Sequence, residues 1–174
     1  VNELLQFSPG TMNIKNFSTL LIIYYLFSSC FGMAEVDSRS NFKPVYMKRS
    51  VFENSIQFEP AKSTLTSGKI YIKDELMYLN DVNKGFQIYN YSNPNNPVKI
   101  GYINIPGSTD VAIRNNVLYV NQATDLVTIN YNVSTNSVTV TNRIKNAFPP
   151  KVSPDGFTAK EKQNQIVIDW TNAN

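Results

Sequence analysis

The chain has 174 residues, with 16 Lys and Arg, 13 Asp and Glu, no histidine and a single cysteine. A formal net charge of +3 without a long basic block is too small to indicate a nucleic-acid partner on electrostatic grounds. Without histidine no Ser-His-Asp or Cys-His arrangement and no His-ligated metal site can form, and one cysteine allows neither an internal disulfide nor a thiolate cage. We therefore expect no cofactor and no metal, and one ordinary globular domain behind a possible leader.

The start of the chain has the pattern of a secretory leader. From Met12 onward it shows one basic residue, Lys15, then an apolar run over residues 17–27, then small residues. This run of about eleven residues is too short to cross a hydrocarbon core as a helix, which takes roughly twenty. We predict a signal peptide over residues 12–29 and interpret residues 1–11 as an over-extension upstream of the true start.

Residues 26–30, Leu-Phe-Ser-Ser-Cys, resemble a bacterial lipobox in the looser form of Bacteroidetes-like bacteria. The resemblance implies cleavage between Ser29 and Cys30 and lipidation of Cys30. Several acyl chains, at about 0.8 kcal/mol per buried methylene, make membrane attachment effectively permanent. An ordinary signal peptide cut nearby and a buried structural cysteine are the alternatives. Residues 30–43 are polar and aperiodic, which predicts a tether between the lipid and the folded domain.

From residue 44 to residue 174 the sequence predicts an all-β domain. Short runs of β-branched and aromatic residues alternate with Asn, Asp, Gly and Pro, and no window has a convincing helical period. The predicted strands cover residues 45–49, 55–59, 69–73, 76–80, 86–91, 98–105, 110–114, 117–121, 126–131, 138–141 and 165–170.

Two hairpins of this domain repeat at an offset of 41 residues. Residues 72–80 align with residues 113–121, and the match resumes where Ile88 aligns with Ile129. The second hairpin turns at Asn-Asn, a pair that tolerates the positive φ angles of a type I′ turn. A period near 41 with about four strands is typical of a propeller blade. Chance similarity of two amphipathic hairpins is the alternative.

Residues 76–101 resemble the LVIVD repeat of bacterial secreted and surface proteins. The second copy departs from the pattern, since Asp125-Leu126 replaces Gly85-Phe86 and residues 132–137 lack its prolines. The mature chain is also similar to short uncharacterised lipoproteins that carry this repeat, which implies a β-propeller-related surface protein. The residues that carry the resemblance are Asp81, Gly85, Ile88, Ser92, Pro94 and Pro97.

The length of the domain limits its architecture. Residues 44–170 hold about three units of 41, whereas a closed propeller needs about four blades or more. We therefore predict antiparallel β-meander repeats whose propeller-like blades form an incomplete, open stack or a small β-sandwich. Residues 45–59 and 166–170 are expected to cap the ends of the stack. Completion of a ring by several copies is the alternative.

Few side chains indicate chemistry. Alternation predicts that Tyr71, Tyr89 and Tyr91 share a strand face, where they could bind sugars or a partner, although strand tyrosines commonly serve packing. Asp81 and Ser92 could cap backbone donors. The carboxylates are dispersed, so no spacing singles out a glycosidase pair, and a calcium site is conceivable where Asp110 and Asp125 converge. We assign no catalytic residue.

Together these features predict a non-enzymatic, lipid-anchored binding or assembly module of a Gram-negative cell envelope. Its lipid would hold it on the outer membrane or on a periplasm-facing membrane. The expected partner is an envelope protein or a glycan rather than nucleic acid, and oligomerisation is an option. Two alternatives stay open, namely an envelope-located carbohydrate-active enzyme and a degenerate fragment of a longer propeller.

Overall fold

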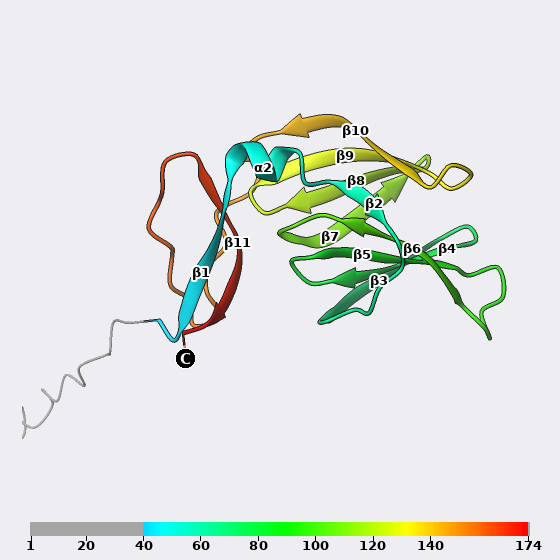
Figure 1. Ribbon diagram of the computed structural model, residues 1–174, viewed down its shortest axis with the longest axis horizontal. Helices are drawn as coiled ribbons and strands as arrows, with labels where there is room; N and C mark the ends of the chain where they lie inside the picture. Colours follow the sequence, from blue (N-terminus) through cyan, green and yellow to red (C-terminus); the bar gives the residue numbers. More distant parts are fainter. Residues whose placement is uncertain (1–39, 174) are drawn as a thin grey trace, which may run out of the picture. The chain divides into compact units, whose positions relative to one another are not determined.

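The computed structural model describes residues 40–173 (Figure 1). These residues form eleven strands in three antiparallel sheets, together with one short helix. The predicted all-β fold is therefore confirmed. The over-extension, the signal peptide, Cys30 and residues 30–39 of the predicted tether lie outside the described residues.

The first sheet has five strands in the order β2-β6-β5-β4-β3. Strands β3 to β6 form an antiparallel meander, and β2 adds to the outer edge of β6, with Phe58 opposite Ile103. The bounds are β2 (Gln57–Glu59), β3 (Ser67–Lys73), β4 (Leu76–Asp81), β5 (Gly85–Asn90) and β6 (Val98–Asn104).

The second sheet has four strands in the order β10-β9-β8-β7. Asn115 and Asn116 both have positive φ angles, of 48° and 61°, as the predicted type I′ turn between β7 and β8 requires. The equivalent turn of the first sheet has a positive φ only at Asp74. The bounds are β7 (Ser108–Arg114), β8 (Val117–Gln122), β9 (Asp125–Asn132) and β10 (Ser137–Ile144).

The 41-residue repeat corresponds to one four-stranded meander, but the predicted match of Ile88 with Ile129 was wrong. Ile88 lies opposite Tyr78, whereas Thr128 lies opposite the equivalent Tyr119, because the turn between β8 and β9 is one residue shorter than the turn between β4 and β5. The first strand of each meander carries a bulge at the same repeat position, between Ser67 and Ile70 in β3 and between Ser108 and Val111 in β7. The last strand of each carries an extra residue at the same position as well, between the partners of Ile88 and Tyr89 in β6 and between Val140 and Asn142 in β10. Because chance similarity of two hairpins would not reproduce their irregularities, the repeat is structural.

The two larger sheets share one hydrophobic core. Each sheet contributes one face to it, so the pair forms an open sandwich in which each sheet has one neighbour. The buried side chains are Tyr78, Phe86, Ile88, Ile103 and Ile105 from the first repeat, and Val111, Leu118, Val120, Val127, Ile129 and Tyr131 from the second.

The flanking segments do not cap the two sheets as predicted. Strand β1 (Phe42–Lys48) pairs with β11 (Gln165–Asn172) in a separate two-stranded sheet, and β1 begins two residues before the predicted domain boundary. Between β1 and β2 the chain forms α2 (Arg49–Glu53), a five-residue helix too short to show a helical period in the sequence. Its buried Phe52 packs against Ala123 and Ile168 in a second, smaller core.

A buried carboxylate joins α2 to the second sheet. Both oxygens of Asp125 accept hydrogen bonds from Arg49, at 3.1 and 2.6 Å, and one accepts another from Arg143 at 2.8 Å. The ring of Phe52 lies near both guanidinium groups, at 5.5 and 5.4 Å. Burial alone would raise the pKa of Asp125, but the hydrogen bonds from Arg143, the Asn146 amide and Arg49 outweigh it and hold the pKa below its ordinary value. We call Arg49, Phe52, Asp125 and Arg143 the Asp125 clamp.

Removing the charge of the clamp should destabilise the whole domain. The Asp125 side chain is 0% exposed, so an amide in its place removes the carboxylate that two partly buried guanidinium groups share and leaves Arg49 with Glu53 alone. We expect Asp125→Asn to lower the free energy of unfolding by about 3–5 kcal/mol. Urea unfolding followed by the fluorescence of Trp170 measures this loss. The control is Asp74→Asn at an exposed turn, which should cost about 0.5 kcal/mol or less; equal midpoints for the two variants would contradict the clamp.

Candidate functional site

The three tyrosines predicted to form one stripe do not share a face. Tyr71 lies opposite Tyr78 on the face that packs against the second sheet, whereas Tyr89 lies opposite Met77 on the other face. Tyr91 follows the end of β5. The prediction was wrong because two residues separate β3 from β4, so each odd-numbered residue of β3 pairs with an even-numbered residue of β4. Tyr71 therefore shares its face with Tyr78 and Ile88 and not with Tyr89.

Tyr71 instead connects the two sheets. Its hydroxyl donates a hydrogen bond to Asp110 of β7, and the ammonium of Lys69 contacts the other oxygen of that carboxylate at 2.5 Å. Asp110 is therefore bound by β3, while Asp125 is bound by the clamp, and the two carboxylates do not build the calcium site that was considered. Within residues 40–173, no three His, Cys, Asp or Glu side chains gather as a metal site would require.

The residues of the repeat motif have structural roles. Asp81 accepts hydrogen bonds from the amides of Leu65 and Thr66, which fixes the segment before β3 across the first sheet. A Cβ atom at Gly85, whose φ is +151°, would lie 2.1 Å from the carbonyl oxygen of Ile103. Only glycine fits this close approach.

The turn between β5 and β6 contains the remaining motif residues. The amide and hydroxyl of Ser92 both donate to the side-chain oxygen of Asn90, at 2.9 and 2.7 Å. Ser92 is thus a donor in an Asx turn. The prediction that it could cap backbone donors was wrong. Pro94 and Pro97 are exposed in the same turn, and Ile88 is fully buried in the core.

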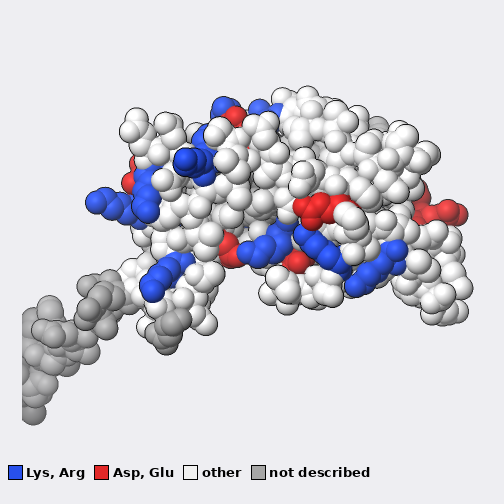
Figure 2. Space-filling model, in the orientation of Figure 1, with Lys and Arg blue, Asp and Glu red and all other residues white. Residues whose placement is uncertain are grey.

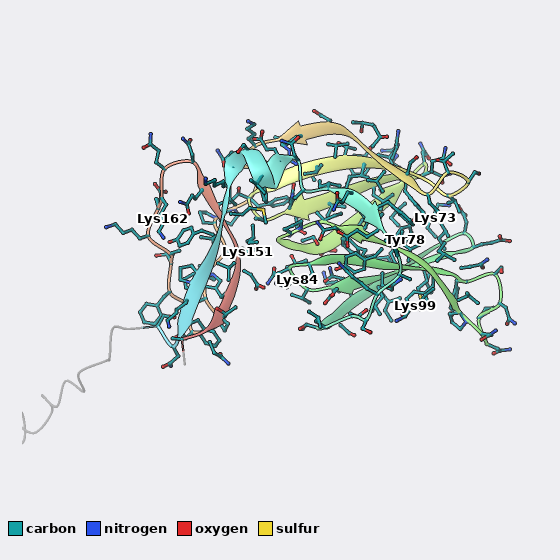
Figure 3. The ribbon with its side chains drawn as sticks, viewed as in Figure 1. Lys73, Tyr78, Lys84, Lys99, Lys151 and Lys162 are labelled. Atoms are coloured by element: carbon teal, nitrogen blue, oxygen red, sulfur yellow. The ribbon has the colours of Figure 1, made fainter. Side chains whose placement is uncertain are left out.

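A cleft of about 440 Å³ lies where the turn between β4 and β5 meets β11 and the loop before it. We call it the lysine cleft. Figure 3 labels its two lysines, one from each side. Its polar and aromatic lining consists of Thr66, Asn83, Lys84, Thr109, Lys151, Asp169 and Trp170.

Hydrogen bonds fix the polar groups of the lysine cleft. Asp169 accepts from the side chains of Asn83 at 2.6 Å and Lys84 at 2.7 Å. The ammonium of Lys151 donates to the side-chain oxygen of Asn83 at 2.8 Å. Asn83 can bridge these charges because its turn needs a positive φ, here 63°, which asparagine adopts readily.

The lysine cleft carries an excess of positive charge. Lys84 and Lys151 face the single carboxylate of Asp169, so one ammonium charge is not balanced within the lining. Burial lowers the pKa of Lys151, and the charge of Asp169 acts in the opposite direction. Figure 2 shows basic and acidic side chains next to one another on the visible face rather than one large basic area. The excess charge is therefore a local feature.

Trp170 adds an aromatic wall to the lysine cleft. Its ring N–H donates to the carbonyl oxygen of Lys151 at 3.3 Å, which ties β11 to the preceding loop. The sequence offered no signal for this cleft. Lys84 and Lys151 are 67 residues apart and stand in loops without a periodic pattern.

A second cavity, of about 500 Å³, opens between the ends of the two sheets. Tyr78 and Tyr131 form part of its wall, and Asp74 and Glu75 form part of its rim. Burial raises the pKa of Tyr78 to about 12, so its phenol stays neutral. Most of its apolar lining, namely Leu76, Tyr78, Ile100, Ile113 and Tyr131, belongs to the hydrophobic core, which makes this cavity a weaker candidate for a specific ligand.

No protein-family model, curated protein or solved structure matches this chain. The resemblance to LVIVD repeats and to bacterial lipoproteins thus stays a prediction. Among the residues that the structure describes, the one helix is too short to span a membrane.

Proposed function

We propose that this protein is a non-enzymatic binding module, held at the cell envelope by a lipid on Cys30, that takes a carboxylate-bearing sugar in the lysine cleft. The observation that carries the proposal is the pair of lysines in a cleft with one carboxylate and a half-buried tryptophan, since Lys84 binds Asp169 and Lys151 binds Asn83. A uronic or sialic acid combines the two features that this lining would recognise, a single negative charge and a ring.

Each part of the ligand has a matching group. A lysine ammonium has three donors, and within the described residues Lys151 gives one of them to protein, to Asn83. A carboxylate beside Lys151 would balance the excess charge and gain a charge-assisted hydrogen bond. The indole of Trp170 offers an amphipathic face for a sugar ring, and the hydroxyls of Thr66 and Thr109 can bind sugar hydroxyls.

The hydrogen bonds that the Asp side chains already make support binding rather than hydrolysis. Glycosidases need a pair of carboxyl groups that flank the scissile bond. Asp169 is the one carboxylate that lines the lysine cleft, and Asn83, Lys84 and the Trp170 amide already occupy it. Asp81, Asp110 and Asp125 serve structural contacts elsewhere.

Sugar binding can be followed by the intrinsic fluorescence of Trp170, because the chain has one tryptophan. We expect D-glucuronate to change the emission saturably and D-glucose to bind at least about tenfold more weakly, since it lacks the charge. Lys151→Ala should weaken glucuronate binding by about tenfold or more, while Lys160→Ala, in the same loop but outside the lining, should not. Equal affinities for glucuronate and glucose, or stronger binding of inorganic phosphate than of glucuronate, would contradict the proposed ligand class.

The affinity should depend on pH through the ammonium of Lys151. Sugar carboxylates are ionised above about pH 4, so the ligand stays charged from neutral to alkaline pH. The pKa of Lys151 lies below the ordinary value of 10.5, so the charge that attracts the ligand is lost before that pH is reached. We expect glucuronate affinity to fall as pH rises toward 10 in the wild type, and the fall to be absent from Lys151→Ala. A flat wild-type profile would exclude Lys151 as the charge partner.

The lipid anchor is tested separately. Expressed from Met12 in a Gram-negative host, the wild type should fractionate with membranes and have an acylated mass that begins at Cys30. Cys30→Ala should lose the acyl mass and leave the membrane fraction. A soluble, unacylated wild type cut at another position would refute the lipobox interpretation and leave the lysine cleft unaffected.

A further inference from the structure

The two sheets bury opposite faces of the repeat. At the 41-residue offset Tyr78 aligns with Tyr119, yet Tyr78 is 4% exposed in the core and Tyr119 is 38% exposed on the outside. In the same strands Leu79 lies on the outer face of the first sheet, whereas its equivalent Val120 is fully buried. Each sheet thus turns one face toward its following neighbour and the other toward its preceding neighbour, as the blades of a propeller do.

The outer face of the first sheet keeps the pattern of a buried face. Ile70 lies opposite Leu79 and Ile72 lies opposite Met77, and all four side chains are apolar. Ile70 and Ile72 are 59% and 54% exposed. In the second sheet the positions equivalent to these four residues pair in the same register, and through them the second sheet packs against the first. They are Val111, Ile113, Leu118 and Val120.

The outer face of the second sheet is the counterpart. Val117 and Tyr119 stand at the positions of Leu76 and Tyr78, which belong to the packing face of the first sheet. On β9 this face carries Leu126, opposite Asn121, and the polar Thr128, opposite Tyr119. One chain therefore carries, on its two outer faces, the strand positions through which its own sheets pack, with a more polar lining on the second sheet.

Charge also matches at the proposed junction. Within the chain, Lys69 of β3 pairs with Asp110 of β7 at 2.5 Å, and these two residues occupy the same repeat position in successive sheets. The same stacking step between two copies would bring Asp110 of one copy beside Lys69 of the next. Both side chains are accessible for it, at 65% exposure for Lys69 and 49% for Asp110.

The segment before β3 leaves room for such a junction. The backbone N–H of Lys62 donates to Gln87 and its ammonium lies over the ring of Tyr102 at 3.8 Å, so this segment covers the β5 and β6 half of the outer face, and it reaches β4 at Asp81. Ile70, Ile72, Met77 and Leu79 belong to the β3 and β4 half (Figure 1). The free area is therefore apolar and lies next to the strand that carries Lys69.

We propose that copies of this chain associate head to tail, the outer face of the second sheet of one copy packing on the outer face of the first sheet of the next. This interface is heterologous, so a closed assembly is a ring. With two sheets per copy, and about four to eight blades in known propellers, the ring holds about two to four copies. The assembly rests on the repeat alone and requires neither the sugar nor the lipid.

The test measures the mass of the full chain in solution by light scattering after size-exclusion chromatography. Cys30→Ser, present throughout, removes the lipid. We expect two to four copies at micromolar concentration, and monomers for Ile72→Glu and for Tyr119→Glu, each of which places a charge on one of the two faces. Val51→Glu is the matched control, because Val51 is an exposed apolar residue on α2. Circular dichroism checks that every variant is folded.

Mixing the two interface variants distinguishes the proposed geometry from a symmetric one. Ile72→Glu keeps an intact second-sheet face and Tyr119→Glu an intact first-sheet face, so their mixture should form a dimer and nothing larger. A dimer that only one of the two changes disrupts would indicate a symmetric contact and overturn the head-to-tail arrangement. A wild type that is monomeric at every concentration up to millimolar would overturn the proposal. This holds whatever the reason for the monomer, even if residues 1–39 cover one of the two faces. Neither result affects the sugar-binding test, which uses a different part of the chain.

Discussion

The described domain depends on one buried ion cluster, the Asp125 clamp. The two repeats differ where this carboxylate stands, since Asp125 opens β9 at the point where the close-packed Gly85 opens β5. A glycine there lets the backbone approach a neighbouring strand, whereas the aspartate receives two arginines, one of them from α2. The departure from the repeat pattern is thus the place where the flanking elements attach to the second sheet. Without that attachment, β1, α2 and β11 would be held by the small core around Phe52 and by the hydrogen bonds of Asp169 with Asn83 and Lys84.

The sequence was sufficient for features that depend on local pattern. All the predicted strands, the Asn115-Asn116 turn and the 41-residue repeat follow from alternation, turn chemistry and spacing. The opposite faces of Tyr71 and Tyr89 could not be predicted, because the face on which a side chain lies depends on the number of residues in each intervening turn. Helix α2 was missed because five residues cannot show a period. The lysine cleft was missed because its charges meet through tertiary contacts between distant loops.

The two proposed activities use different parts of the molecule. The lysine cleft lies at the junction of the β4–β5 turn with β11, so it depends on how the flanking elements attach. The outer faces belong to the repeats themselves. A ring of copies would present several clefts at once, and a polysaccharide with many carboxylates would then bind with an effective concentration that one cleft cannot provide.

The bulges described in β3, β7 and β10 bear on how the protein avoids aggregation. Unpaired strand edges are templates for pairing with other chains, and natural proteins blunt them with irregularities and charge. Each of these three strands ends its sheet and carries a register shift, and β2 is three residues long. The inner pairs β4–β5 and β8–β9 are regular. Growth by strand addition is therefore disfavoured in every larger sheet, which leaves the flat faces as the surfaces through which sheets of this kind can join without forming fibrils.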